Sequence, residues 1–244
     1  ARPTLFIANS DLEAKKVYNE LRFYTKDKVE YLGTDEIYFY HLDAKDRSEE
    51  AKKLRVLLKL AKKQKTIVVT SVDAILRKYI PKKVLLDNIF TYKIGDIINL
   101  EELSQNLVRL GYERVSRIEG LGQFSIRGGI IDVYSLEYTN PIRIELFDDE
   151  IDSIRTFDVF SQKSIDKIKK VVITPSREFI YPEDTTSAVE KIKAETNKYT
   201  DDDVLKNIEN ISDKTYFQGV ENYIDYLYDD QNKSIFSYLP DNGI

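Results

Sequence analysis

The sequence lacks or nearly lacks the residue types that build most covalent and metal-dependent active sites. It contains no cysteine, no methionine and no tryptophan, and one histidine, His41, among 244 residues. Without cysteine there can be no disulfide bond and no thiolate metal site, which fits a protein of the reducing cytoplasm. A single histidine excludes the usual zinc constellations and most catalytic triads. We therefore expect no cofactor and interpret His41 as a surface or packing residue.

Longer sequence features are missing as well. A run of about 20 apolar residues, the length of a membrane span, does not occur, and no signal peptide is recognisable. No Gly-x-x-x-x-Gly-Lys-Ser/Thr phosphate loop is present, and Gly120-x-Gly precedes a strand rather than a helix, so neither nucleotide fingerprint is met. Position 1 is not methionine, and we expect the sequence to begin inside a longer protein.

Charge is plentiful but unevenly distributed. The formal net charge is −5, whereas residues 183–230 hold thirteen acidic and five basic residues and residues 45–65 hold nine basic and three acidic ones. An acidic balance argues against broad nucleic-acid binding. We interpret the acidic segment as a solvated face or a flexible connection. A solvated helix face is preferred over a phosphate contact for the basic residues Lys52, Lys53, Lys62 and Lys63.

The first part of the sequence alternates strand and helix patterns. A capping box, Ser10-Asp-Leu-Glu13, begins a helix to about Phe23 that should bury Leu12, Val17 and Leu21. A second helix from Ser48 should bury Leu54, Leu57, Leu58 and Ala61. The expected strands are 4–8, short and buried, then 29–32, 37–42 and 66–70, and a short helix covers 71–79. This order predicts a parallel α/β domain with right-handed crossovers.

A different pattern follows from about residue 89. A strand at 91–95 precedes a helix that Asn99 caps and Gly111 ends. Period-two patterning then predicts an antiparallel meander with strands at 123–127, 130–136, 142–147 and 151–157. We expect Gly128-Gly129 to form a bulge or tight bend. A helix on an antiparallel sheet is a small α+β domain, and an apolar strand at 171–174 comes after it.

One face of this meander carries a distinctive set of side chains. Alternation places Arg143, Glu145 and Phe147 on the face opposite Ile144, and Arg127 joins them from a neighbouring strand. Arginine and aromatic residues are enriched at binding hot spots. Two interpretations stay open: a docking surface, or a Phe147 buried under a helix beside solvated arginines. The acidic residues Asp148, Asp149, Glu150 and Asp152 are interpreted as a solvated turn and not as a metal site.

Several segments resemble one bacterial family. Gly111-Tyr-Glu-Arg-Val, Gly122-Gln-Phe-Ser-Ile-Arg-Gly-Gly-Ile-Ile-Asp-Val, Pro141-Ile-Arg-Ile-Glu-Leu-Phe-Asp-Asp-Glu and Ser161-Gln-Lys-Ser are similar to the second domain of the transcription-repair coupling factors (Mfd), and more loosely to UvrB. Arg2-Pro-Thr-Leu-Phe-Ile-Ala-Asn and Ile67-Val-Val-Thr-Ser-Val-Asp resemble strands of the first domain. The missing phosphate loop and the short connection from Gly33 to Ser48 favour Mfd over UvrB.

The resemblance implies a domain plan. It implies a degenerate helicase-like parallel α/β domain formed by residues 1–88 and 171–244, with an inserted α+β domain at 89–170. It also implies a non-catalytic docking module that recruits UvrA to stalled RNA polymerase in nucleotide excision repair. The resemblance also implies that the parent protein is a DNA-dependent ATPase whose motor and RNA-polymerase-binding domains would lie elsewhere in that protein. The alternative is a nucleic-acid-binding relic of a helicase that contacts the DNA backbone.

The resemblance further implies which residues bind the partner. Arg127, Arg143 and Phe147 match the positions through which the family contacts UvrA, and Glu145 between them would orient the arginines. Because Arg143 and Phe147 do not lie on the inward face, we expect their replacement to leave folding almost untouched. No metal or nucleotide site is expected, and DNA should bind weakly if at all.

Overall fold

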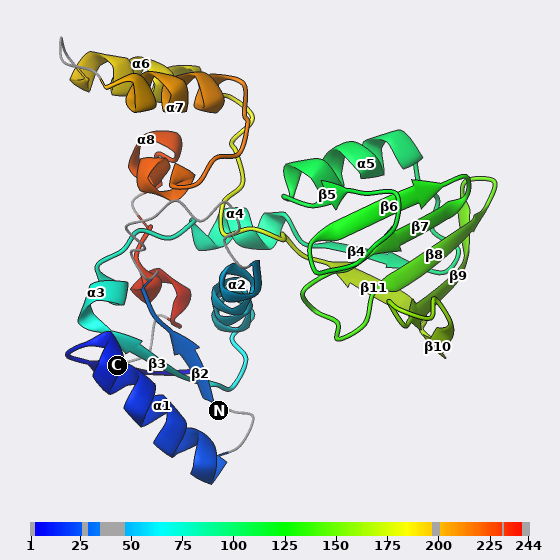
Figure 1. Ribbon diagram of the computed structural model, residues 1–244, viewed down its shortest axis with the longest axis horizontal. Helices are drawn as coiled ribbons and strands as arrows, with labels where there is room; N and C mark the ends of the chain where they lie inside the picture. The colour runs from blue at the N-terminus through cyan, green and yellow to red at the C-terminus, as the bar shows by residue number, and fades with distance from the viewer. Residues whose placement is uncertain (1–2, 26–28, 35–46, 197–200, 231, 241–244) are drawn as a thin grey trace. The chain divides into compact units, whose positions relative to one another are not determined.

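The computed structural model describes residues 3–25, 29–34, 47–196, 201–230 and 232–240 (Figure 1). These residues form a mixed α/β structure with a three-stranded parallel sheet, a six-stranded mainly antiparallel sheet and a two-stranded antiparallel sheet. The mixed α/β class predicted from the sequence is confirmed. None of the described helices combines the length and the apolar character that spanning a membrane would require. Two compact units are present, and each is described by itself.

The first unit contains the described residues before position 38, Val56–Val84 and the residues from Tyr181 onwards. Its parallel sheet has the order β1-β3-β2, with β1 at Thr4–Ala8, β3 at Ile67–Ser71 and β2 at Val29–Leu32. The predicted parallel arrangement is therefore confirmed. The predicted burial of β1 is wrong, because β1 is an edge strand on which Phe6 and Ile7 stay exposed.

Helix α1 (Asp11–Thr25) begins with the predicted capping box. Ser10 Oγ accepts a hydrogen bond from the Glu13 N–H at 3.3 Å, and Glu13 Oε2 accepts one from the Asn9 N–H at 3.2 Å. Val17 and Leu21 pack against the buried Ala14 but are themselves only half-buried, so their predicted burial is confirmed in part. Leu12 is exposed, contrary to prediction, because it lies two positions before Ala14 and hence on the other side of the helix.

The remaining helices of the described chain follow local signals. Helix α2 (Arg47–Ala61) buries the predicted leucines and also Val56 and Leu60, so it is enclosed on most sides. A short α3 (Val72–Ile75) is capped by Ser71, and an additional helix, α4 (Lys82–Asp87), follows Pro81. The last part of the chain is helical, with α6 at Thr186–Glu195, α7 at Asp202–Ser212, η2 at Val220–Tyr223, α8 at Ile224–Leu227 and η3 at Ile235–Tyr238. The predicted strand at 37–42 lies outside the described residues.

The second unit contains Leu85–Ile180 together with the described residues between 47 and 55. Its main sheet has the order β10-β9-β8-β7-β6-β5 (Figure 1). The strands are β5 (Glu113–Arg114), β6 (Gln123–Arg127), β7 (Ile130–Val133), β8 (Ile142–Phe147), β9 (Glu150–Phe157) and β10 (Ser164–Lys167). The predicted meander is thus present as strands β6 to β9.

Helix α5 (Leu100–Arg109) supplies apolar side chains to this unit. Asn99 Oδ1 accepts hydrogen bonds from the N–H groups of Glu101 and Glu102, so the predicted cap is confirmed. Leu103 and Leu107 on its inner side are buried. Gly111 ends the helix with φ +87°, a conformation that favours glycine.

The observed unit extends beyond the predicted span of 89–170. Strand β11 (Lys170–Ile173) pairs antiparallel with β4 (Phe90–Lys93), which holds both ends of this stretch together. The Tyr112 hydroxyl donates a hydrogen bond of 2.8 Å to the Thr174 carbonyl, just after β11. These contacts bring the residues after 170 into the second unit.

The Gly128-Gly129 pair is a hairpin turn. Arg127 pairs with Ile130 across it, and Gly128 has φ +58°. The sequence correctly predicts a break here, but the chain reverses direction instead of bending within one strand. A Cβ at Gly129 would lie 3.1 Å from the Leu146 carbonyl oxygen, so the close approach of β8 also favours glycine.

Candidate protein-docking face

The four predicted site residues lie on one side of the six-stranded sheet. Arg127 pairs with Ile130, which pairs with Glu145, and paired residues in an antiparallel ladder share a face. Arg143 and Phe147 lie two positions before and after Glu145 on β8. The shared face is therefore confirmed, and we call this side the docking face. The opposite side carries Ile144, which is fully buried.

A buried aspartate joins the two predicted arginines. Asp132 on β7 lies directly opposite Arg143 on β8. Asp132 is buried, with 2% of its surface exposed. Arg143 Nε donates to Asp132 Oδ1 at 2.6 Å, and Arg143 Nη2 donates to Asp132 Oδ2 at 2.8 Å. Arg127 Nη2 donates to the same Oδ2 at 2.7 Å. One carboxylate thus fixes both guanidinium groups.

Arg143 is held from further sides. Its guanidinium lies over the ring of the buried Phe157, 4.4 Å from the centroid, and Nη2 also donates to Gln162 Oε1 at 3.1 Å. The hydrogen bonds from Arg143 to Asp132 raise the pKa of the guanidinium above its usual value. The side chain is only 13% exposed. These contacts remove the basis for the expectation that Arg143 can be replaced without affecting the fold, and we now expect its replacement to lower stability.

Glu145 has different partners from those expected. It accepts hydrogen bonds from the Ser153 hydroxyl at 2.7 Å and from Arg155 Nη1 at 2.8 Å, and it forms an ion pair with Arg155. The Ser153 hydrogen bond, together with Arg155, lowers the pKa of the Glu145 carboxyl below its usual value. The acid that orients Arg127 and Arg143 is Asp132, while Glu145 orients Arg155.

Phe147 is the exposed apolar residue of the face. Its side chain is 75% exposed near the end of β8, where it pairs with Glu150 across the turn at Asp148. The interpretation that placed Phe147 under a helix is therefore wrong. A sheet that carries both an exposed aromatic and a fixed arginine pair has the composition of a binding hot spot.

Two features, one on the docking face and one on a loop beside the sheet, were missed from the sequence. Asp132 interrupts the apolar run Ile130–Val133. Because it alternates with Ile131 and Val133, which face the core, its position could have indicated that it lies on the opposite side of the sheet, with Arg143. Phe160, which is 88% exposed, lies on the loop between β9 and β10. No periodic pattern covers that loop, so the sequence held no signal for its exposure.

The other residues considered from the sequence give less support to a functional site. His41 lies outside the described residues. Of the predicted basic residues, Lys53 on α2 is buried and Lys52 is exposed, and just after the helix Lys62 is half-buried and Lys63 is exposed. The predicted solvated face is therefore only partly present. Within the described ranges, no group of three or more His, Cys, Asp or Glu side chains could hold a metal ion.

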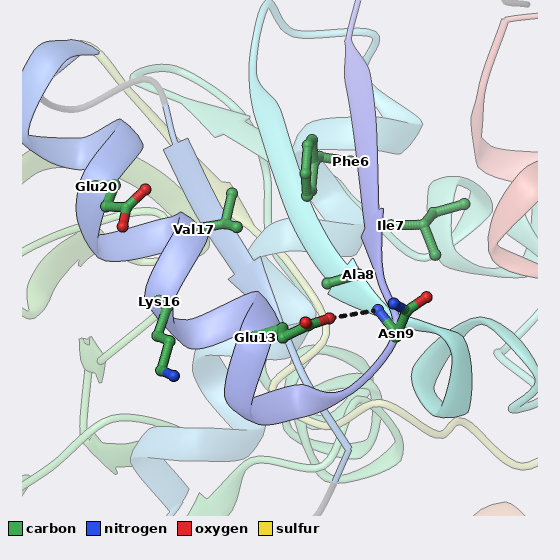
Figure 2. A pocket seen from close by; sticks show the side chains of 8 residues that line it. All are labelled: Phe6, Ile7, Ala8, Asn9, Glu13, Lys16, Val17 and Glu20. Atoms are coloured by element: carbon green, nitrogen blue, oxygen red, sulfur yellow. Dashed lines mark hydrogen bonds between the residues drawn. The ribbon is translucent and has the colours of Figure 1, made fainter.

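A hollow of about 430 Å³ lies between β1 and α1 in the first unit (Figure 2). One of its polar groups serves the local fold: the Glu13 carboxylate accepts a hydrogen bond from the Asn9 N–H as part of the helix cap. The lining is otherwise a mixture of apolar and oppositely charged side chains, namely Phe6, Ile7, Ala8, Asn9, Glu13, Lys16, Val17 and Glu20. This arrangement suggests no chemistry.

Comparison with known proteins agrees with the sequence resemblance. Residues 90–179 match the family described as the UvrB interaction domain. The chain is 34% identical, over its whole length, to a transcription-repair-coupling factor of Bacillus subtilis. It is 31% identical, over 87% of its length, to one of Staphylococcus epidermidis. It covers 22% and 18% of these two proteins, and so spans about a fifth of the curated relatives it matches.

The matched segment, residues 90–179, contains α5, every strand of the docking face and both strands of the two-stranded sheet. The second unit of the structure and the family match therefore describe nearly the same stretch of chain. The predicted family is confirmed: this chain is related over its whole length to a segment of the transcription-repair-coupling factors and contains a UvrB interaction domain.

Proposed function

We propose that this chain is the non-catalytic docking module of a transcription-repair coupling factor, and that its docking face recruits UvrA in nucleotide excision repair. In this proposal the residues before and after the UvrB interaction domain derive from a helicase-like α/β domain, into which that domain, residues 90–179, is inserted. ATP hydrolysis and RNA-polymerase binding belong to other parts of such a protein. The chain has no phosphate loop with which to bind a nucleotide.

The observation that carries the proposal is an exposed Phe147 on β8, the strand that also carries Arg143, one of two arginines that a buried aspartate fixes in place. Hot spots are enriched in arginine and aromatic residues. Side chains that are already rigid before binding lose less conformational entropy when the complex forms. The four predicted contacts then divide into two kinds. Phe147 and Arg127 are exposed and can touch the partner directly. Arg143 and Glu145 are mostly covered and support the exposed pair.

Arg127 is suited to a carboxylate on the partner. Its Nη2 is held by Asp132, while its contact with the Ser116 carbonyl through Nη1 is long at 3.5 Å. The guanidinium therefore has donors to offer in a fixed plane, which matches the two oxygens of a carboxylate. Phe147 would exclude water from this pair by entering an apolar pocket of the partner.

Calorimetric titration of the chain with purified UvrA tests the proposal. We expect the wild-type chain to bind, and Phe147→Ala to weaken binding by about 2 kcal/mol or more. Phe23→Ala is the matched control, because Phe23 is 81% exposed on α1 in the first unit and carries no role in the proposal. No binding by the wild-type chain, or equal affinities for the two variants, would contradict the proposal.

A further inference from the structure

The loop Asp158–Lys163 between β9 and β10 is closed by hydrogen bonds of its own. The Asp158 N–H donates to the Lys163 carbonyl at 2.9 Å, and the Gln162 N–H donates to the Asp158 carbonyl at 2.8 Å. The N–H and the hydroxyl of Ser161 both donate to Asp158 Oδ1, at 2.8 Å and 2.7 Å. The backbone of this short loop is therefore ordered before any partner arrives.

The same loop is tied to the docking face from two directions. Arg143 Nη2 donates to Gln162 Oε1 at 3.1 Å, and Gln162 Nε2 in turn donates to the Val159 carbonyl at 2.8 Å. From the other direction, Arg117 Nη2 donates to the carbonyl of Phe160 at 3.1 Å. The main chain on both sides of Phe160 is thus held by residues bonded to the face or its neighbouring loop.

The side chain of Phe160 takes no part in this network. It is 88% exposed, the largest exposed fraction of any large apolar side chain among the described residues. A single exposed apolar residue needs no explanation in general. Here, however, an ordered loop presents it, and the arginine that holds the loop is one of the two fixed by Asp132. A rigid aromatic on a fixed backbone has the form of a binding anchor.

The charges around Phe160 indicate what it would meet. Arg117 and Lys163 are exposed, and Arg127 reaches the carbonyl of Ser116, the residue before Arg117. Asp158 is the acid of this loop, and its carboxylate is engaged by Ser161. A complementary surface would therefore combine an apolar pocket with flanking carboxylates.

We propose that Phe160 is a second aromatic anchor of the docking face, which inserts into an apolar pocket of UvrA bordered by acidic side chains, and that Arg143 acts as a positioning residue by holding Gln162. The inference rests on the proposed function, since it extends the same face to one more element. It gives the covered Arg143 a role in binding that needs no direct contact with the partner.

Calorimetric titrations with UvrA test this inference, using wild type, Phe160→Ala, Phe147→Ala and the exposed control Phe23→Ala. We expect Phe160→Ala to raise Kd by about tenfold or more, equivalent to about 1.4 kcal/mol, while Phe23→Ala leaves Kd unchanged. Thermal melts should be alike for all four proteins, because each replaced ring is exposed.

A double-mutant cycle separates the positioning role from a general loosening of the fold. Gln162→Ala removes the link to Arg143, and we expect it to weaken UvrA binding by about three- to fivefold when Phe160 is present. In a Phe160→Ala background the same change should have no effect on Kd. Equal effects in both backgrounds would overturn the claim that Arg143 and Gln162 act through Phe160.

The remaining outcomes are distinguishable. If wild type binds UvrA and Phe147→Ala weakens binding, but Phe160→Ala behaves like Phe23→Ala, the inference fails and the proposed function stands. If wild type does not bind UvrA, both fail. Sedimentation of the chain alone shows whether it self-associates, and so tests whether a second copy of the chain, rather than UvrA, covers Phe160. A Phe160→Ala change that abolishes self-association while UvrA binding persists unchanged would also overturn the inference.

Discussion

At the scale of single residues, Asp132 is the least replaceable polar group of the docking face. A buried carboxylate without a cation loses hydration and gains nothing in return, so we expect the loss of its pairing with Arg143 and Arg127 to destabilise the fold. A buried ionic cluster of this kind need not make the protein more stable than apolar side chains of similar volume would. Its clearest consequence is a fixed orientation for both arginines, which an apolar pair could not provide.

The unequal exposure of the two arginines leads to a prediction. Arg143→Ala should lower the free energy of unfolding by about 3 kcal/mol, the lower end of the range for breaking a buried pair, because Arg127 still contacts Asp132. Arg127→Ala removes the more exposed partner and should cost about 1 kcal/mol or less. Urea titration of both variants measures the difference. Similar midpoints would show that Arg143 is not the principal partner of Asp132.

Neighbouring positions on β8 should respond oppositely to truncation. Ile144 is fully buried, so Ile144→Ala should lower the free energy of unfolding by about 2–5 kcal/mol through the cavity it leaves. Phe147→Ala, three positions later on the exposed side, should change it by about 0.5 kcal/mol at most. Thermal melts compare the two variants directly. A large loss for Phe147→Ala would mean that its ring is covered in solution.

At the scale of elements, the end of α5 is attached to the segment after β11. Gly111 leaves no room for a side chain, since a Cβ would lie 2.6 Å from Arg177 Cγ. The next residue, Tyr112, is buried and donates its hydroxyl hydrogen to the Thr174 carbonyl. Gly111 and Tyr112 thus connect the end of α5 to residues 174–177, which are far from it in sequence. These contacts help to hold the second unit together.

The burial of the Tyr112 hydroxyl leads to a prediction of how the stability of the protein changes with pH. Burial raises the pKa of its hydroxyl far above the usual value. Below about pH 10 the folded and unfolded states both keep this proton, and the contribution of the group is complete. Above that pH the unfolded state loses the proton first, so stability falls, by up to about 1.4 kcal/mol per pH unit for one proton.

The matched variant is Tyr112→Phe. At neutral pH it should lose about 1 kcal/mol, because the Thr174 carbonyl loses its donor. Between pH 10 and 11 its stability should fall less steeply than that of the wild type. The difference between the two curves isolates Tyr112 from the other tyrosines. Parallel curves would indicate that Tyr112 ionises equally in both states.

At the scale of the whole molecule, charge limits the choice of partner. The net charge is −5, and residues 183–230 carry most of the acidic excess. Duplex DNA is strongly negative and is bound through clusters of open lysines and arginines. Helix α2 offers few of these, because Lys53 is buried and Lys59 is paired with Glu30. A protein partner fits this distribution better than nucleic acid does.

An ionic-strength series gives the corresponding prediction. Any binding to duplex DNA should be weak and should decline log-linearly as salt increases, as phosphate contacts require. Binding to UvrA should depend less on salt, because the apolar burial of Phe147 is not screened. Mobility shifts and calorimetry at matched salt concentrations compare the two. Tight DNA binding that persists at high salt would favour the nucleic-acid-binding alternative.

The sequence by itself determined the local elements and the side of each strand. Ser10 and Asn99 cap their helices as predicted, because a cap is a hydrogen bond within a few residues of its own chain. The alternation along β8 places Arg143 and Phe147 opposite Ile144, because the period of a strand is a property of its backbone. The resemblance to the coupling factors rests on the same contiguous residues.

Only the tertiary structure decided what those side chains contact. Asp132 meets Arg143 because the register between β7 and β8 sets them opposite, and register depends on packing across strands. Phe6 on β1 is exposed, despite its apolar strand, because β1 lies at a sheet edge. Phe160 is exposed on a loop whose sequence shows no strand or helix periodicity. Contacts between distant residues depend on the whole fold, and periodicity along the chain does not contain them.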